Sequence, residues 1–424
     1  MNQIRILYHF LRRLVVYGIR TAVRGDASIV DARPAPWFRM LRERRPCVPA
    51  EDNSVKIVLS FGWKGGASSY LAGRLKSDLR EEYVLVARPF GCKGWLAVEA
   101  WKNAKRVRTC VARGLSSFLS LQKDLPRMKV EIVVNEIYTW QVYAGSRTFS
   151  AALLDGLFSE ILELRKGLDA RLTYLVHDYF PICPMVFMAD GTDRYCGDEK
   201  DAGKCRDCIR RGGGWSGSVD KESIDVGKWR EAARRIFECS DEVRCFSGDT
   251  KGRLMSYLGP KIAYSVVPHD FVPPDNWRRP ALSSGPMTVG FFGGGVPLKG
   301  IGKVRELCRL MEGDGGRVVV AGEVRGGTMP GNCTVLGRYR REDMPAIVEK
   351  YGINVAFFAS ICPETFSYVV QELMMLGLPV VCFDIGAPSE RVRAYEWGRV
   401  ARCFDVGHVH ELLSELHRKR SLVS

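Results

Sequence analysis

The sequence contains no run of about 18 uncharged apolar residues, the minimum for a transmembrane helix, so no membrane-spanning helix is expected. A secretory signal is also lacking, because Arg12 and Arg13 interrupt the apolar stretch at the N-terminus and no small-residue cleavage site follows closely. We therefore expect a cytoplasmic protein. In that reducing compartment its 14 cysteines should be free thiols or metal ligands rather than disulfides.

Basic residues exceed acidic ones in this chain. Its 424 residues are enough for two or three domains, and 46% apolar and 26% charged residues are ordinary for a globular protein. The formal net charge of +15 is not ordinary. It indicates an anionic partner, which could be a nucleic acid, an anionic membrane surface or a phosphorylated substrate.

Residues 4–24, within an N-terminal segment of about 1–30, predict a basic amphipathic helix. Arginines occupy one arc of the helical wheel and apolar side chains the opposite arc. The basic positions are Arg5, Arg12, Arg13, Arg20 and Arg24. Such a helix can lie on an anionic bilayer, or it can pack on its own protein with the arginines in solvent, and the pattern does not distinguish the two.

Strand-like and helix-like segments alternate along the chain, which predicts parallel sheets covered on both faces. In the first half, strands are expected at 55–62, 82–89, 129–137 and 172–178, with an amphipathic helix at 152–168. Residues 270–287 contain four prolines and little apolar periodicity, so they form the best candidate linker. The alternation restarts after them, which divides the chain into two α/β halves.

Glu364 and Glu372 stand in a strand–loop–helix–strand pattern. An apolar run at 354–360 is followed by the loop 361–365, a helix-like segment at 366–377 and another apolar run. In a βαβ unit the loop after the strand carries the ligand site, and the helix N-terminus can hold a diphosphate. Carboxylates there suit vicinal hydroxyls. The alternative is a solvated helix face.

The run PETFSYVVQE resembles the E-x7-E motif of retaining glycosyltransferases of family four, the glycosyltransferase group 1 enzymes. The continuation LGLPVVCFDIGAPSERV is similar to that family as well. The resemblance implies the GT-B fold, which has two Rossmann-like domains with parallel sheets facing across a cleft, and it implies a nucleotide-sugar donor. The expected domains are an N-terminal acceptor domain at 50–278, a donor domain at 285–405 and a C-terminal helix at 406–424.

The resemblance also implies roles for individual residues in the donor domain. Glu372 would bind the ribose and Glu364 the hydroxyls of the donor sugar. The amides of Phe366, Ser367 and Tyr368 would bind the diphosphate. The transition state should resemble an oxocarbenium ion, and the leaving phosphate should act as the base in the retention mechanism.

A glycine loop with Lys299 follows the first strand of the second half. Gly294 and Gly295 allow close approach to a diphosphate, and Lys299 can neutralise it. Members of the resembled family usually carry an arginine a few residues before this lysine, and here that position falls among glycines. Neutralisation then depends on Lys299 and helix amides, or on an arginine from elsewhere. The alternative is a surface lysine.

Four further residues from the N-terminal half are considered. Gly65 and Gly66 follow the first core strand, where the resemblance implies a loop near the donor phosphates or the acceptor; plain turn glycines are the alternative. His177 ends a strand, and the resemblance implies that it faces the donor sugar, as a catalytic group or as a hydrogen-bonding one. A structural histidine is the alternative. For His269 a hinge or structural role is favoured.

Four cysteines form a second cluster, in an insert at about 183–215. Cys183, Cys196, Cys205 and Cys208 have the spacing C-x12-C-x8-C-x2-C in a segment without regular periodicity. Four thiolates predict a structural zinc, since they leave no open position for catalysis. Redox use of C-x-x-C and unrelated thiols are the alternatives. The segment also resembles a cysteine-bearing insert of some bacterial surface-polysaccharide glycosyltransferases.

No Asp-x-Asp occurs, so no catalytic divalent metal is expected of the kind used by the other main glycosyltransferase fold. The sequence thus predicts a retaining glycosyltransferase that builds a surface polysaccharide such as O-antigen or capsule. Its acceptor would be a saccharide or lipid-linked saccharide, with peripheral contact at the inner face of the plasma membrane. The alternatives are a zinc-containing nucleic-acid-binding protein, which the dispersed basic residues disfavour, and a non-catalytic glycosyltransferase-like scaffold.

Overall fold

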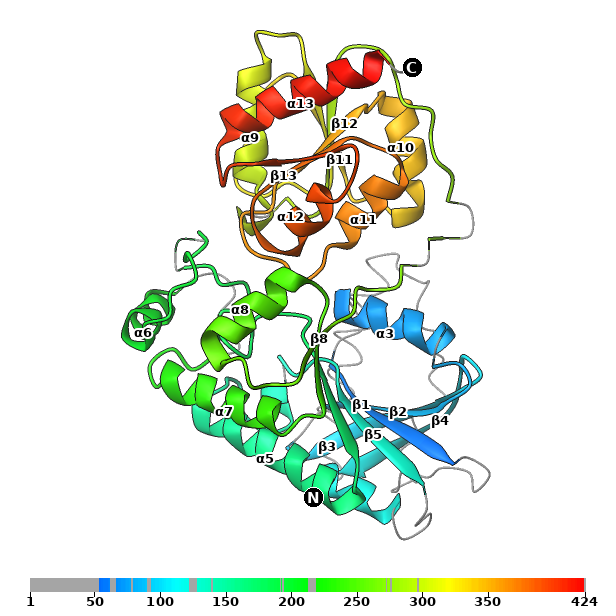
Figure 1. Cartoon of the computed structure of the whole chain (residues 1–424), viewed down its shortest axis with the longest axis vertical. Helices are drawn as coiled ribbons and strands as arrows, with labels where there is room; N and C mark the ends of the chain where they lie inside the picture. The colour runs from blue at the N-terminus through cyan, green and yellow to red at the C-terminus, as the bar shows by residue number, and fades with distance from the viewer. Residues whose placement is uncertain are drawn as a thin grey trace, which may run out of the picture. The chain divides into compact units, whose positions relative to one another are not determined.

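A computed structural model describes residues 53–422, apart from 62–65, 78, 90–92, 122–127, 139, 191, 193, 213–218, 272, 275–276 and 296. The predicted helix at 4–24 and Gly65 lie outside the described residues. The chain divides into two compact units (Figure 1). Unit 1 holds the described residues up to Leu175 with Gly217–Arg244 and Lys261–Ala263. Unit 2 holds Val176–Ser216, Cys245–Pro260 and the described residues from Tyr264 onward.

The larger sheet has eight strands in the order β4-β3-β2-β1-β5-β6-β7-β8. Its strands are β1 (Ser54–Leu59), β2 (Tyr83–Pro89), β3 (Trp95–Lys102), β4 (Lys105–Arg113), β5 (Lys129–Val134), β6 (Arg171–Leu175), β7 (Glu242–Cys245) and β8 (Tyr264–Val266). The pairs β2–β1, β1–β5, β5–β6 and β6–β7 are parallel, whereas β3 and β4 form an antiparallel hairpin at one edge.

The helices of the N-terminal half arise from local sequence signals. They are α3 (Gly66–Lys76), η1 (Leu115–Leu119), η2 (Trp140–Val142), α5 (Ala151–Leu168), α6 (Ala202–Arg211), α7 (Val226–Glu238) and α8 (Gly248–Leu258). Ser150 caps α5 by accepting a hydrogen bond from the Leu153 amide. The apolar stripe of α5 packs beside α7, and Tyr174 of β6 contacts Phe237 of α7 with their ring centres 4.7 Å apart.

The smaller sheet has six parallel strands in the order β11-β10-β9-β12-β13-β14. The strands are β9 (Thr288–Phe292), β10 (Arg317–Ala321), β11 (Cys333–Gly337), β12 (Val355–Phe358), β13 (Val380–Phe383) and β14 (Gly398–Ala401). The helical elements are η4 (Pro297–Lys299), α9 (Ile301–Met311), η5 (Arg341–Asp343), α10 (Met344–Tyr351), α11 (Tyr368–Met375), α12 (Gly386–Arg393) and α13 (Val406–Ser421). Strand order reverses between β9 and β12, which is where open α/β sheets bind ligands.

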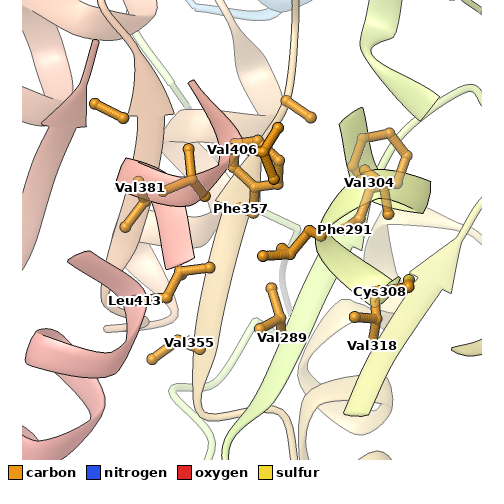
Figure 2. Close-up of a cluster of buried hydrophobic side chains, with 14 of the residues drawn as sticks. Val289, Phe291, Val304, Cys308, Val318, Val355, Phe357, Val381, Val406 and Leu413 are labelled. Carbon is orange, nitrogen blue, oxygen red and sulfur yellow. The ribbon is translucent and has the colours of Figure 1, made fainter. Parts of the chain in front are cut away.

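Both faces of the smaller sheet are apolar and covered. Figure 2 shows one face, where Val289 and Phe357 pack against Val304 of α9 and Leu413 of α13. Alternate residues of the same strands face a second cluster that includes α10 and α11. Double burial explains why these strands read as continuous apolar runs.

The predicted fold class is confirmed, since the chain is α/β with two largely parallel sheets. The hairpin of β3 and β4 is an addition that the sequence analysis did not predict. The helix α11, which follows the Glu364 loop, begins at Tyr368, two residues later than expected. Among the described residues, no helix is both long and apolar enough to cross a bilayer.

We predict that Val289→Ala lowers the free energy of unfolding by about 2 kcal/mol, because it removes two methyl groups and leaves a cavity. Val289 is 0% exposed in the β9 core, whereas Val335 on β11 is 43% exposed. Val335→Ala is therefore the matched control and should change stability little. Urea unfolding of both variants tests this. Equal stabilities for the two variants would contradict the assigned core.

Candidate functional site

Two loops of unit 2 meet at the point where the strand order reverses. The loop after β9 and the loop after β12 pack backbone against backbone, and the Ile361 amide donates to the Leu298 carbonyl oxygen at 3.1 Å. Gly300 makes this possible: its φ is +82°, and a Cβ there would lie 1.8 Å from the Ala359 carbonyl oxygen. Any side chain at Gly300 would push the two loops apart.

An ion pair joins the two loops. Lys299 Nζ lies 2.7 Å from Glu364 Oε1. Burial lowers the pKa of Lys299, but the Glu364 carboxylate and Cys362 together raise it by more, so the net pKa is raised. The lysine is thus a cation at any physiological pH, and it is held at the loop by a carboxylate that is itself largely buried.

The helix α11 begins directly after the Glu364 loop. Ser367 is its N-cap and accepts a hydrogen bond from the Val370 amide. Thr365 Oγ1 donates to the backbone oxygen of His177 at 2.8 Å. Because the first amides of a helix have no partner within the helix, this end of α11 is suited to an anion.

Glu372 lies in the second turn of α11 and is almost fully buried beside Arg341 of η5. Its Oε1 is 2.5 Å from Arg341 Nε. Burial raises the pKa of Glu372 to about 7, although Arg341 opposes this rise. The Arg341 guanidinium also lies 4.2 Å from the ring centre of Phe271 and 5.8 Å from that of Tyr368. A carboxylate, a guanidinium and two aromatic rings therefore gather at one position.

Ring side chains connect His177 to the Glu364 loop. His269 stacks on Phe366 with ring centres 4.1 Å apart, and Phe246 lies 4.0 Å from His269 and 4.8 Å from His177. Burial lowers the pKa of His177 to about 3, and burial with neighbouring groups lowers that of His269 to about 2. Both imidazoles are neutral at physiological pH, so they can form hydrogen bonds but carry no charge.

The predicted glycines have different surroundings. Gly295 pairs with the strand-like segment at Val324, and a Cβ on it would lie 2.4 Å from the Glu323 carbonyl oxygen. Gly294 has no neighbouring atom within 4 Å of such a Cβ. Gly66 begins α3 in unit 1, whereas Lys299, the Glu364 loop, Glu372 and His177 lie in unit 2.

The predicted zinc site is not supported. Within the described part of the chain, no group of three or more His, Cys, Asp or Glu side chains could hold a metal ion. Cys205 and Cys208 lie one turn apart on α6, and Cys205 Sγ instead contacts the Glu199 carbonyl oxygen at 3.4 Å. Burial, followed by the charges of the other three thiols, raises the pKa of Cys183 to about 12.

Hydrogen bonds of Arg253 contribute to the order of the segment that carries these cysteines. Arg253 of α8 donates to Tyr195 at 2.6 Å and to both carboxylate oxygens of Asp198 at 2.5 Å. It also binds Asp249 at 2.8 Å. The prediction of zinc assumed that the segment has no other source of order, and Arg253 supplies one.

Sequence reasoning missed three residues of this site. Arg341 contacts Glu372, Arg391 of α12 lies over Phe366, and Glu390 accepts hydrogen bonds from the amides of Gly248 and Asp249. The sequence signal for Arg341 and Arg391 was weak, because each lies among other arginines with no spacing that singles it out. Glu390 belongs to the resembled continuation but had no predicted role.

Residues 280–422 match the family described as Glycosyl transferases group 1. No curated protein matches the chain in sequence. Among solved structures, Anabaena Alr3699/HepE in complex with UDP and glucose is 14% identical, with a TM-score of 0.50 over 87% of this chain and 91% of that one. Sucrose-phosphate synthase from Thermosynechococcus elongatus is 12% identical, with a TM-score of 0.51 over 88% and 94%. The chain thus has the GT-B fold of such enzymes.

We predict that Glu372 destabilises the folded chain as pH rises. Its pKa is about 7 when folded, against an ordinary value of 4.5. Between these values the folded state retains a proton that the unfolded state has lost. The free energy of unfolding therefore falls by up to about 3 kcal/mol as the pH rises from 4.5 to about 7. Below pH 4.5 this loss is absent, because Glu372 is protonated in both states. Glu372→Gln should remove this part of the pH dependence in urea unfolding at about pH 5 and about pH 8.

The control is Glu411→Gln, which changes an exposed carboxylate on α13. It should keep the pH dependence of the unsubstituted chain. Identical slopes for the Glu372→Gln variant and the unsubstituted chain would show that Glu372 ionises normally.

Proposed function

We propose that this protein is a retaining glycosyltransferase that moves a sugar from a nucleotide-sugar donor to a saccharide or lipid-linked saccharide. One observation supports this above the others. Glu364, paired with Lys299, and Glu372, on the helix that follows, lie where the strand order reverses in a sheet that matches a glycosyltransferase group 1 domain. That is the position at which such sheets bind nucleotides.

In this proposal the donor spans the length between Glu364 and Glu372. The diphosphate binds at the N-terminus of α11, close to the cationic Lys299. The ribose hydroxyls donate hydrogen bonds to the Glu372 carboxylate, and Arg341 favours the ionised form of that carboxylate. The Glu364 carboxylate accepts hydrogen bonds from hydroxyls of the donor sugar, and the ion pair with Lys299 orients that carboxylate.

The chemistry requires that the bond from the anomeric carbon to the diphosphate breaks while a bond to an acceptor oxygen forms. Lys299 and the α11 amides stabilise the negative charge that develops on the leaving diphosphate. The departing phosphate takes the acceptor proton from the same face, which retains the configuration. His177 is neutral, so its part is a hydrogen bond to a sugar hydroxyl rather than proton transfer through an imidazolium.

The donor and acceptor classes follow from weaker observations. The HepE structure contains UDP and glucose, so UDP-sugars are the first donors to test. The net charge of +15 supports a phosphorylated, lipid-linked acceptor at an anionic inner membrane face. We assign the acceptor to the part of the chain at 50–278 and the donor to 285–405. The product would enter a surface polysaccharide.

We predict that one class of nucleotide sugar raises the melting temperature of the purified chain. A panel of UDP-, GDP-, dTDP- and CMP-sugars is measured by thermal shift. A ligand at about 100 times its Kd stabilises the fold by about 2.7 kcal/mol. Glu372→Ala should lose the shift because it removes the ribose acceptor, and Glu411→Ala, on the exposed face of α13, should keep it.

The same panel can overturn the proposal. If no nucleotide sugar shifts the melting temperature, the donor site is wrong, and retention of RNA or duplex DNA then tests the nucleic-acid alternative. A shift without sugar transfer to any saccharide acceptor would support the non-catalytic scaffold.

We predict that Lys299→Met lowers the rate of sugar transfer by about a hundredfold to a thousandfold, the usual effect of removing a group that stabilises a developing anion. The effect should fall on kcat more than on KM, because the charge on the diphosphate grows in the transition state. Lys303→Met is the control, since that lysine of α9 contacts Glu306 on the same helix and the carbonyl oxygen of Phe404, which lies between β14 and α13. A loss confined to KM would restrict Lys299 to ground-state binding.

A further inference from the structure

The proposed diphosphate position has less positive charge than its ligand requires. Lys299 is the single cationic residue in the stretch 293–300, and the stretch 359–367 has none. The Lys299 charge is balanced by Glu364 at 2.7 Å. A diphosphate with two ionised phosphates would therefore meet helix amides and a lysine that is already paired. Another cation is needed nearby.

Arg391 lies on the helix that packs onto the Glu364 loop. The Ala387 amide of α12 donates to the Glu364 carbonyl oxygen at 2.9 Å, and a Cβ on Gly386 would lie 2.6 Å from the Glu364 nitrogen. In Figure 1, α11 and α12 lie side by side at the same end of the sheet of unit 2. Side chains of a helix lean toward its N-terminus, which directs Arg391 toward that loop.

The guanidinium of Arg391 is held against the loop by two contacts. Its central carbon lies 4.5 Å from the ring centre of Phe366, the residue before the N-cap of α11. One terminal nitrogen donates to the side-chain oxygen of Gln371 on the same helix. These contacts place a planar cation at the end of α11 whose amides face the proposed diphosphate.

Arg391 is an incompletely satisfied cation. Among the described residues its buried Nε has no hydrogen-bond partner. The charge of Glu390 raises the pKa of Arg391, but burial lowers it by more, so the net pKa is lowered. Its neighbour Glu390 directs both carboxylate oxygens to the amides of Gly248 and Asp249. A partly buried guanidinium whose hydrogen-bonding capacity is not filled is costly to the folded state, and an anion that binds beside it would reduce that cost.

We propose that Arg391 supplies the second positive charge for the donor diphosphate, in place of the arginine that the glycine loop lacks. This inference rests on the proposed function, because it concerns the same donor site. The guanidinium presents a fork of N–H donors that matches phosphate oxygens, and its stacking on Phe366 keeps it oriented before the donor arrives. The role is recognition of the phosphates, separate from that of the nucleoside.

The test compares nucleoside diphosphates with their nucleosides on the full chain. UDP and uridine form one pair of probes, GDP and guanosine another, and affinities are measured by titration calorimetry. Arg391→Met retains most of the stem but no charge. It should weaken the diphosphate about tenfold to a hundredfold and leave the nucleoside unchanged. Arg391→Lys should restore part of the loss.

The matched control is Arg393→Met on the same helix, because Arg393 is exposed and pairs with Asp384 at 2.9 Å. It should change neither affinity. If Arg391→Met does not fold, Arg391→Gln provides a second neutral replacement, and the melting temperature without ligand verifies the fold of each variant.

Two outcomes would overturn the inference while leaving the proposed function in place. If affinity for the diphosphate and for the nucleoside falls equally, Arg391 has only a structural role in positioning Phe366 and Gln371. If neither affinity changes, Arg391 takes no part in binding. If the unsubstituted chain binds none of these probes, the donor site itself is wrong, and the inference fails together with the proposed function.

Discussion

The close approach of two loops at Gly300 is the constraint on which the proposed donor site depends. The residue before it, Lys299, ends η4, and the carbonyl oxygen against which Gly300 packs belongs to the segment that leads from β12 into the Glu364 loop. Because the contact is backbone on backbone, it leaves no room for a side chain between the two loops. With the loops at this separation, Lys299 Nζ lies 2.7 Å from Glu364 Oε1. Gly386 plays the same part where α12 approaches the Glu364 backbone, since a Cβ on Gly386 would lie 2.6 Å from the Glu364 nitrogen.

Electrostatic compensation is arranged differently at each acidic or basic group around these loops. Glu364 is paired with a lysine and Glu372 with a guanidinium, while Glu390 binds two amides at the N-terminus of α8. Arg391 is less completely satisfied, since its buried Nε has no hydrogen-bond partner among the described residues. The raised pKa of Glu372 shows that Arg341 offsets only part of the cost of burial. The incomplete hydrogen bonding of Arg391 is the feature that suits an anionic ligand in our proposal.

The local pattern of apolar residues predicted most of the helices and strands. The doubly buried strands of the smaller sheet read as apolar runs. Among the helices between them, α10 ends at Gly352 and α11 is capped by Ser367, so the order of these elements along the chain was predictable. The hairpin of β3 and β4 was not, because its edge strand is exposed over half its length and lacks a clean apolar alternation. The zinc prediction also lacks support, because it relied on cysteine spacing alone and not on contacts with distant residues. Cysteine spacing suggested a metal, whereas the structure shows hydrogen bonds from Arg253, which lies later in the chain, to Tyr195 and Asp198 in that segment.

The sequence by itself determined the two α/β halves, the loop that carries Glu364 and the helix that carries Glu372, since these depend on residues within about ten positions of each other. The predicted roles of those residues remain proposals. Tertiary structure alone decided which side chain each acid meets: Lys299 comes from another βα loop, Arg341 from beyond β11, and Arg391 from the following helix. It also decided that Glu372 is buried enough for its pKa to rise and that both histidines are neutral. Burial and ion pairing are properties of atoms brought together across the chain, and the energy of a charge depends on those neighbours rather than on its place in the sequence.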